Sequence, residues 1–126
     1  MSGGDGTAAL ERVRALCLAL PECNDRPSHG SPAFFVRDKR CFVMYLDDHH
    51  GDGRLALWCA APEGMQHALV TGNPEAYFVP PYVGHRGWVG VRLDRSLDWD
   101  EIAGAIEEAW LTVAPKGLVE AFTREA

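Results

Sequence analysis

The chain has 126 residues, 47% of them hydrophobic, and its 12 Lys and Arg residues against 18 Asp and Glu residues give a formal net charge of −6. This length suits one domain that buries roughly two thirds of its unfolded surface. The acidic balance argues against strong nonspecific attraction to phosphate backbones, although a local basic patch can exist within an acidic protein. No apolar run is long enough to span a membrane and no signal-peptide pattern occurs, so we expect a cytoplasmic protein without a membrane partner.

Four cysteines occur, at positions 17, 23, 41 and 59, and no two of them form a C-x-x-C pair. We therefore expect reduced thiols that pack as small hydrophobic side chains. Residues 1–6 are rich in Gly and Ser, and we expect them to form a disordered tail in front of a single domain over residues 7–126.

The first predicted element is a helix. Thr7 is suited to cap it, and it extends to about residue 20, where Pro21 ends it. Its apolar residues recur at helical spacing on one face. Residues 22–31 follow, and their content of Pro, Asn, Asp, Ser and Gly predicts a loop.

Three short strands are predicted next, because each segment is rich in residues that favour extended backbone. They cover residues 32–36, 41–46 and 54–59. The loop between the last two, residues 47–53, has the sequence DDHHGDG, and its closing Asp-Gly pair suits the positive φ of a hairpin.

The second half of the chain predicts one short helix and two further strands. Pro62 suits a helix start and Gly72 a helix stop. The strands are predicted at residues 75–79 and 88–94, the latter with apolar residues in alternation.

The last helix has the clearest boundaries in the sequence. Asp98 stands at the N-cap position with Glu101 three residues later, a variant of the capping box. Pro115 ends this helix, and residues 116–124 are expected to add a further helical turn.

The order α-β-β-β-α-β-β-α predicts an α+β fold, a two-layer sandwich in which helices cover one face of an antiparallel sheet of about five strands. Alternation along the strands assigns an aliphatic set to the helix side, namely Val89, Val91, Leu93, Leu55 and Leu57. A second set then shares the open face, namely Trp88, Arg92, Trp58 and Arg54. A register error of one residue would invert this assignment.

The whole prediction is organised around residues 78–94. Pro80 and Pro81 fix φ and remove two backbone donors, so an extended loop is expected there. Two glycines bracket His85 and Arg86, which predicts a tight turn that presents a basic tip.

This stretch, PPYVGHRGWVGVRLD, resembles the signature of the MmcQ/YjbR-like family of small bacterial proteins. The resemblance continues through residues 10–118, at Leu20-Pro21, Ser31-Pro32-Ala33-Phe34, Leu57-Trp58, Leu97-Asp98-Trp99 and Val113-Ala114-Pro115-Lys116. It implies a two-layer α/β domain related in shape to the frataxin (CyaY) fold. Members of the family are often labelled DNA-binding, and the resemblance implies no catalytic motif.

Two sets of side chains are candidate binding sites for nucleic acid. On the sheet, Trp58 and Trp88 beside Arg54 and Arg92 could stack bases and neutralise phosphate, or form a protein-interaction patch. Alternatively, the indoles simply cover the sheet. At the turns, the His85-Arg86 tip and the Lys39-Arg40 turn could act as two projecting wings, although turns are commonly charged for solubility alone.

A third hypothesis places a small anionic ligand beside the double-proline loop. Tyr82, Arg86 and Trp88 would line its pocket, so this hypothesis requires a concave surface there. A flat surface would count against it.

Metal and enzyme chemistry are weaker interpretations. The acidic and histidine residues of loop 47–53 match no calcium loop. The shape resemblance to frataxin suggests iron, but the first helix lacks the acidic ridge that this role needs. We therefore expect no metal and no cofactor. No catalytic motif occurs, and nothing in the sequence supports Cys23 and His29 as nucleophile and base. We therefore expect a non-catalytic binding module, foremost for DNA, and alternatively for a small anionic ligand or a protein partner.

Overall fold

The computed structural model of the protein describes the backbone of residues 2–95 and 97–125, and the side chains of residues 8–95 and 97–125. The predicted tail, residues 1–6, lies outside the part of the chain whose side chains are described. Within the described residues, no helix combines the length and the apolar character that a membrane crossing needs.

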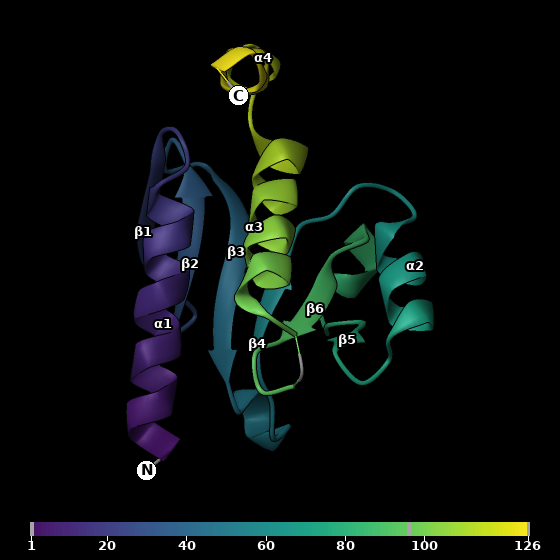
Figure 1. The fold of residues 1–126 in the computed structure, drawn as a ribbon. Coiled ribbons are helices and arrows are strands. Elements are labelled where there is room, and N and C mark those ends of the chain that lie inside the picture. Colours follow the sequence, from purple (N-terminus) through teal and green to yellow (C-terminus); the bar gives the residue numbers. More distant parts are fainter. Residues whose placement is uncertain (1, 96, 126) are drawn as a thin grey trace.

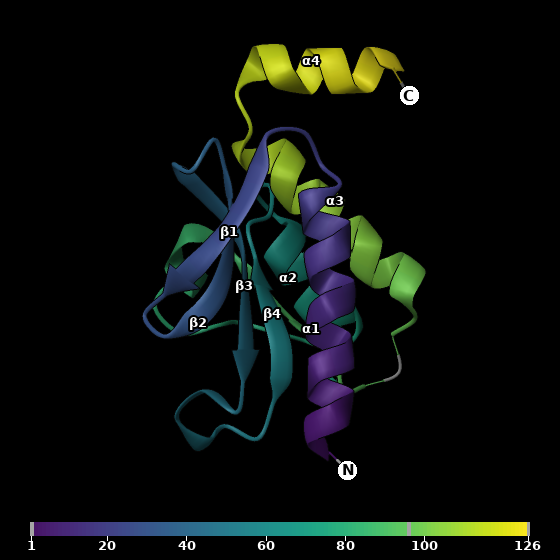
Figure 2. The same ribbon diagram turned by 90° about the vertical axis from the view of Figure 1, so that its left-hand side faces the viewer.

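The fold is an open antiparallel sheet with helices packed on one face (Figures 1 and 2), as the sequence predicted. Its strand order is β1-β2-β3-β4-β6-β5. The strands are β1 (Cys23–Ser28), β2 (Ser31–Val36), β3 (Arg40–Asp47), β4 (Leu55–Cys59), β5 (Tyr77–Phe78) and β6 (Val89–Arg92). The helices are α1 (Ser2–Leu18), α2 (Met65–Gly72), α3 (Trp99–Val113) and α4 (Lys116–Glu125), with short 3-10 turns η1 (His49–Gly51) and η2 (Gly84–Arg86).

Helices α1 and α3 lie side by side over the sheet, and α2 packs beside β5 and β6 (Figure 1). Helix α4 lies beyond the end of α3, where the rings of Trp110 and Phe122 are 4.9 Å apart. The core lies between these helices and the sheet. Its fully buried side chains include Val13 and Cys17 of α1, Ile102, Ile106 and Trp110 of α3, and Phe34, Val43, Leu57 and Val91 of the strands.

Helix α3 starts where its capping residue predicts. The Asp98 side chain accepts a hydrogen bond of 2.9 Å from the backbone N–H of Glu101, so one of the free donors of the first turn is satisfied. Deep in the core, the indole N–H of Trp110 donates to the carbonyl of Pro21 at 3.2 Å. This bond joins the end of α3 to the turn that follows α1.

The sheet has six strands rather than the predicted five, because β1 forms within the predicted loop 22–31. Its polar sequence suits an edge strand, where only one side needs ladder hydrogen bonds. Side-chain contacts compensate for the absence of apolar residues. Arg26 donates to Asp38 at 2.7 Å, and Arg14 of α1 donates to Asp25 at 3.0 Å.

Several predicted boundaries also shift. Helix α1 starts at Ser2 rather than after Thr7, and β5 is limited to Tyr77–Phe78. The remaining strand and helix assignments agree with the prediction to within a few residues.

The close approach of β5 to β6 requires a glycine at position 90. Gly90 is paired with Phe78, and a Cβ at this position would overlap the phenyl ring. We expect Gly90→Ala to destabilise the protein by about 1–3 kcal/mol, because the buried ring must move. The matched variant Gly104→Ala has open space at its Cβ on helix α3, and we expect it to stabilise by roughly 0.5–1 kcal/mol. Urea denaturation of both variants measures the difference, and equal effects would contradict the packing argument.

Candidate functional site

The sheet face turned away from α1 and α3 carries a cavity of about 600 Å³, which we call the sheet-face cavity. Its floor consists of Met44 and Leu46 of β3 and Trp58 of β4. Met44 is paired with Trp58, while their neighbours Val43 and Leu57 point into the core, so alternation places the floor residues on the opposite face. Three loops form its walls.

The first wall is the hairpin between β3 and β4. Asp48 and His50 adopt positive φ there, and Asp48 Oδ1 accepts a 2.7 Å hydrogen bond from the backbone N–H of Gly53. This geometry places the ring of His49 over Trp58, with 4.9 Å between the ring centroids, and His50 beside His49 at 4.1 Å. Asp48 thus shapes the hairpin, and among the described residues no three His, Cys, Asp or Glu side chains are grouped to hold a metal ion.

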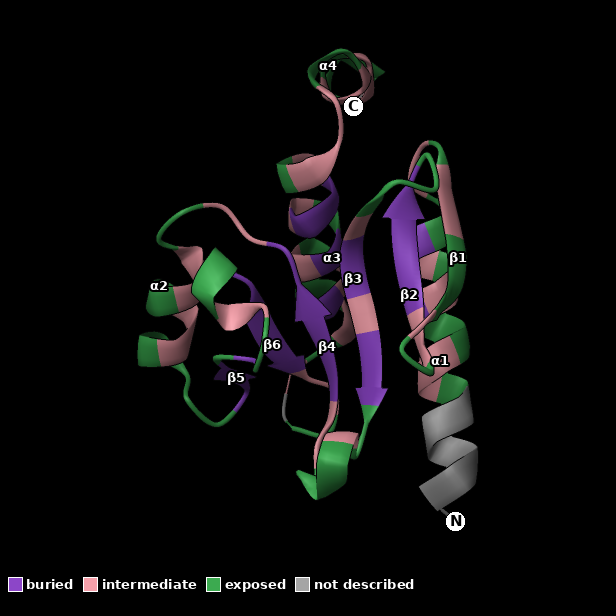
Figure 3. Ribbon diagram, turned by 180° about the vertical axis from the view of Figure 1, so that it is seen from behind, coloured by how far each residue is buried: buried purple, intermediate pink, exposed green. Residues whose placement is uncertain are grey.

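The second wall is the double-proline loop, which connects β5 to β6 and lies on the rear side of the sheet (Figure 3). Tyr82 projects from it, 68% exposed, with its ring 6.0 Å from His49 and 6.4 Å from Trp58. The loop is held by Gln66 of α2, whose side-chain amide donates to the carbonyls of Gly84 at 2.8 Å and Trp88 at 2.6 Å. Tyr82 is therefore presented by a fixed backbone.

The third wall is the tight turn between β1 and β2. His29 and Gly30 both adopt positive φ, and the flanking residues Ser28 and Ser31 face each other across the strand pair. Ser28, His29 and Ser31 all line the cavity. The site thus gathers three histidines from two turns that are far apart in the sequence.

The floor of the sheet-face cavity contains a polar atom without a partner. Trp58 is only 3% exposed, and its indole N–H has no hydrogen-bond acceptor within the described residues. A buried donor left unpaired costs about 1–3 kcal/mol. An acceptor on a bound molecule would remove this cost.

Residues 18–112 match the model of the YjbR family. The chain belongs to the YjbR family. The resemblance found in the sequence is thereby confirmed.

This YjbR-family protein is 40% identical over 60 residues to the uncharacterised proteins Rv2570 of Mycobacterium tuberculosis and Mb2600 of Mycobacterium bovis. The match covers 48% of this chain and 46% of each relative, so the chain spans about half the length of the curated relatives it matches. The crystal structure of the Deinococcus radiodurans protein DR2400, a DUF419 domain, aligns with a TM-score of 0.71 over 92% of this chain and 86% of that one. At 19% identity this likeness shows the fold alone. The implied relation to the frataxin fold stays a prediction.

The two indoles assigned to the open face of the YjbR-family sheet are not exposed. Trp58 and Trp88 lie on the predicted face, but they are only 3% and 4% exposed. Two loops cover them. Trp58 is next to His49 of the β3–β4 hairpin and Tyr82 of the double-proline loop, and Trp88 is next to Arg86, whose guanidinium lies 5.4 Å from its ring centroid. The indoles therefore do not form an exposed patch, and the alternative that they cover the sheet agrees better with their burial.

Two of the predicted arginines are engaged with neighbours. Arg92 donates to Asp94 at 2.9 and 3.1 Å. Arg54 lies 4.0 Å above the ring of Phe78, with Asp52 at 3.9 Å. Neither guanidinium is therefore fully available to a phosphate.

The two predicted wings differ in direction. His85 and Arg86 are exposed on η2, at the double-proline loop. Lys39 and Arg40 are exposed at the turn between β2 and β3, and Arg40 makes a 3.5 Å contact with the carbonyl of Val113 at the end of α3. Arg40 thus turns toward the helix layer, whereas Arg86 lies over the opposite face.

Of the predicted site residues, the structure brings Tyr82 and Trp58 together in the sheet-face cavity. The sequence does not indicate the three cavity histidines, because in the sequence His49 and His50 suggest only metal ligands and His29 suggests only a base beside Cys23. Cys23 is the first residue of β1 and His29 follows its last residue, so a strand about 17 Å long separates them. Burial raises the pKa of the Cys23 thiol to about 11, which keeps it protonated at neutral pH.

The Arg92–Asp94 pair gives a pH-dependent contribution to stability. Burial raises the pKa of Asp94, but hydrogen bonds from Arg92 and from the backbone N–H of Leu55 lower it by more, so the net pKa is below the usual value. The stabilisation is therefore present above the unfolded-state pKa of about 3.9 and is lost as the pH falls through the lower folded-state pKa.

We expect Asp94→Asn to reduce the free energy of unfolding at pH 7 by about 1 kcal/mol or less, because the pair is partly screened by water. The gap between wild type and variant should narrow as the pH is lowered below about 4. Urea denaturation across this range measures it, with Glu75→Gln at an exposed position as the control. A gap that stays constant with pH would show that Asp94 acts through packing alone.

Proposed function

We propose that this YjbR-family protein is a cytoplasmic, non-catalytic binder of a small anionic molecule with a flat apolar body, held in the sheet-face cavity. The observation that carries the proposal is the lining of this cavity. In a protein with a net charge of −6, the described residues that line it include three histidines and no carboxylate. Such a lining tolerates negative charge where most of the surface would repel it.

Size and chemistry agree with this ligand class. The volume of about 600 Å³ lies within the range of small-molecule sites, roughly 300–1,000 Å³. Trp58, Met44 and Leu46 offer an apolar floor on which a planar ring can pack. The imidazoles, the serine hydroxyls and the Tyr82 hydroxyl can donate hydrogen bonds to an anionic group at the rim.

The groups that contact the ligand come from three loops whose backbones are held by hydrogen bonds. Binding therefore requires no large movement of these loops. The hairpin is held by Asp48, the double-proline loop by Gln66, and the β1–β2 turn by its strand pairing. The unpartnered N–H of Trp58 adds one donor at the floor. These features support binding rather than chemistry, because no hydrogen-bonded nucleophile and base occur among the described lining residues.

DNA binding, the leading prediction from sequence, is the second candidate. It is favoured by Arg86, His85 and Lys39, which are exposed and have no ion pair within the described residues. It is disfavoured by the positions of Trp58 and Trp88, because Trp58 lies at the floor of a bounded cavity and Trp88 is buried. Neither indole is presented on an open surface where successive bases of a nucleic-acid strand could stack. A protein partner on the Trp-bearing face meets the same obstacle.

Phenylacetate and its neutral analogue phenylacetamide provide a direct test of the anion site. We expect phenylacetate to quench the fluorescence of Trp58 and to shift the amide resonances of the three walls, with phenylacetamide at least about tenfold weaker. Removing one charge-assisted hydrogen bond in His49→Gln should weaken binding about tenfold.

The matched control is His67→Gln, an exposed histidine on α2 outside the cavity. It should bind phenylacetate as the wild type does. Equal affinity for the two analogues, or equal losses in the His49 and His67 variants, would refute an anion site at this cavity.

The DNA alternative is tested by fluorescence anisotropy of labelled duplex and single-stranded DNA at low and near-physiological salt. Saturable binding that weakens with salt and falls in the Arg86→Ala/Arg92→Ala double variant would support DNA binding as the function. We expect no such binding, because Arg92 is already bound to Asp94.

A further inference from the structure

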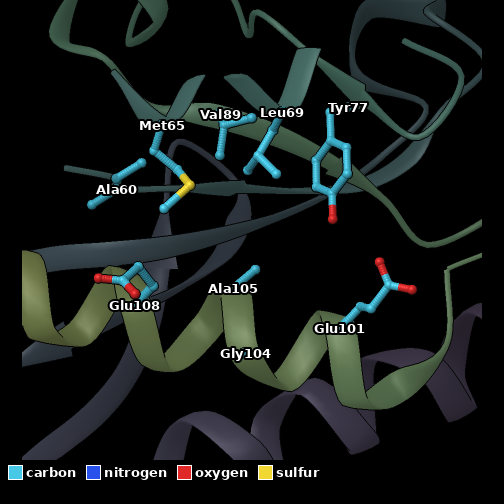
Figure 4. Close-up of a pocket in the computed structure, with 10 residues that line it drawn as sticks. Ala60, Met65, Leu69, Tyr77, Val89, Glu101, Gly104, Ala105 and Glu108 are labelled. Carbon is cyan, nitrogen blue, oxygen red and sulfur yellow. The ribbon is translucent and has the colours of Figure 1, made fainter. Parts of the chain in front are cut away.

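A second cavity, of about 210 Å³, lies on the helix side of the sheet and is separate from the sheet-face cavity. We call it the interhelix slot, because it lies between α2 and α3 above β5 and β6 (Figure 4). Its apolar walls include Met65 and Leu69 of α2, Val89 of β6 and Ala105 of α3. Gly104 and Ala105 of α3 have small side chains, so they leave space for the slot between its walls.

Two carboxylates stand at opposite ends of the interhelix slot. Glu101 and Glu108 are seven residues apart on α3, which places them on the same helix face with an axial separation of about 10 Å. Figure 4 shows their carboxyl groups at the two ends, with Ala105 between them. No ion pair or hydrogen bond to either carboxylate occurs within the described part of the chain.

Tyr77 is a second, independent indication of a ligand. The residue is only 7% exposed, yet its hydroxyl points into the slot toward Glu101 (Figure 4). No described residue makes a hydrogen bond to this hydroxyl, and the hydroxyl oxygen is open to the slot, unlike the enclosed indole N–H of Trp58. Burial and then the charge of Glu101 raise the pKa of Tyr77, so the hydroxyl stays neutral and can accept a hydrogen bond from a cation.

An apolar channel with a carboxylate at each end matches a short hydrocarbon chain with a cation at each end. We propose that the interhelix slot binds a linear aliphatic diamine in its diprotonated form. One ammonium group contacts Glu101 and the Tyr77 hydroxyl, the other contacts Glu108, and the methylene chain lies against Leu69 and Ala105.

The size of the slot sets the length of the diamine. At about 30 Å³ for each water-sized group, 210 Å³ holds about seven of them. This equals the number of heavy atoms in 1,5-diaminopentane. The chain contributes by desolvation, whereas the two charges fix the orientation.

The test is an amide-resolved NMR titration of the full chain with 1,5-diaminopentane, pentylamine and 1,5-pentanediol at one ionic strength. We expect saturable shifts centred on Leu69, Tyr77 and Ala105 with the diamine. Pentylamine should bind at least about tenfold more weakly, because it loses one charged contact, and the diol should not bind.

Glu101→Gln and Glu108→Gln should each reduce the affinity for the diamine at least about fivefold. Glu107→Gln is the matched control, since it removes the same charge from the same helix at an exposed position outside the slot. Ala105→Leu keeps both carboxylates but fills the channel, and should abolish binding.

Equal weakening in the Glu107 and Glu108 variants would overturn the proposal, because it would show only general attraction to an acidic surface. Equal affinity for the diamine and pentylamine would also overturn it. If Ala105→Leu fails to fold, as judged by its amide spectrum, the three charge variants still decide the outcome. The proposal does not depend on the sheet-face cavity, so phenylacetate binding can fail or succeed independently of it.

Discussion

The sheet has two apolar faces, and only one of them is covered by helices. On the other face, Trp58 and Trp88 present large ring surfaces that would be costly to leave in water. The double-proline loop covers Trp88 and, together with His49 of the β3–β4 hairpin, Trp58. The loop is held in place by the two hydrogen bonds from Gln66. The position of this loop therefore depends on a helix of the opposite layer, and the shape of the whole rear face depends on the loop.

The sheet-face cavity follows from the same constraint. The loop reaches toward β4 with Tyr82, and the neighbouring surface of β3 is left to the two turns that carry His29, His49 and His50. These turns use positive φ to bend back over the sheet, as Asp48 and His50 show. The cavity is the region that three short loops surround without closing.

The sequence allowed the strands of the central sheet to be predicted, because alternation of apolar residues depends only on neighbours along the chain. Val89 and Val91 face the helices as expected, and Asp98 caps α3. Strand β1 is not predicted from the sequence, because its formation depends on contacts with residues distant along the chain, such as that of Arg26 with Asp38. A strand stabilised in this way has no local apolar signal.

The candidate site was less predictable than the fold for a related reason. Alternation correctly assigned Trp58 to the face away from the helices, but a pattern with a period of two does not show whether a loop will cover that face. Tyr82 was found because the double-proline loop is an obvious local feature. The histidines were not, since their convergence on one cavity requires the hairpin and the β1–β2 turn to fold toward each other.

The charges of the protein are distributed by local pairing rather than spread evenly. Arg26, Arg37 and Arg92 are each held by a nearby carboxylate, which leaves little of the positive charge free to form a continuous surface for a polyanion. Glu101 and Glu108 have no such partner in the described part of the chain. The net charge of −6 therefore does not indicate which charges line either cavity. One cavity is lined by histidines and the other by carboxylates, and the sheet between them lets one small domain present sites of opposite preference on its two faces.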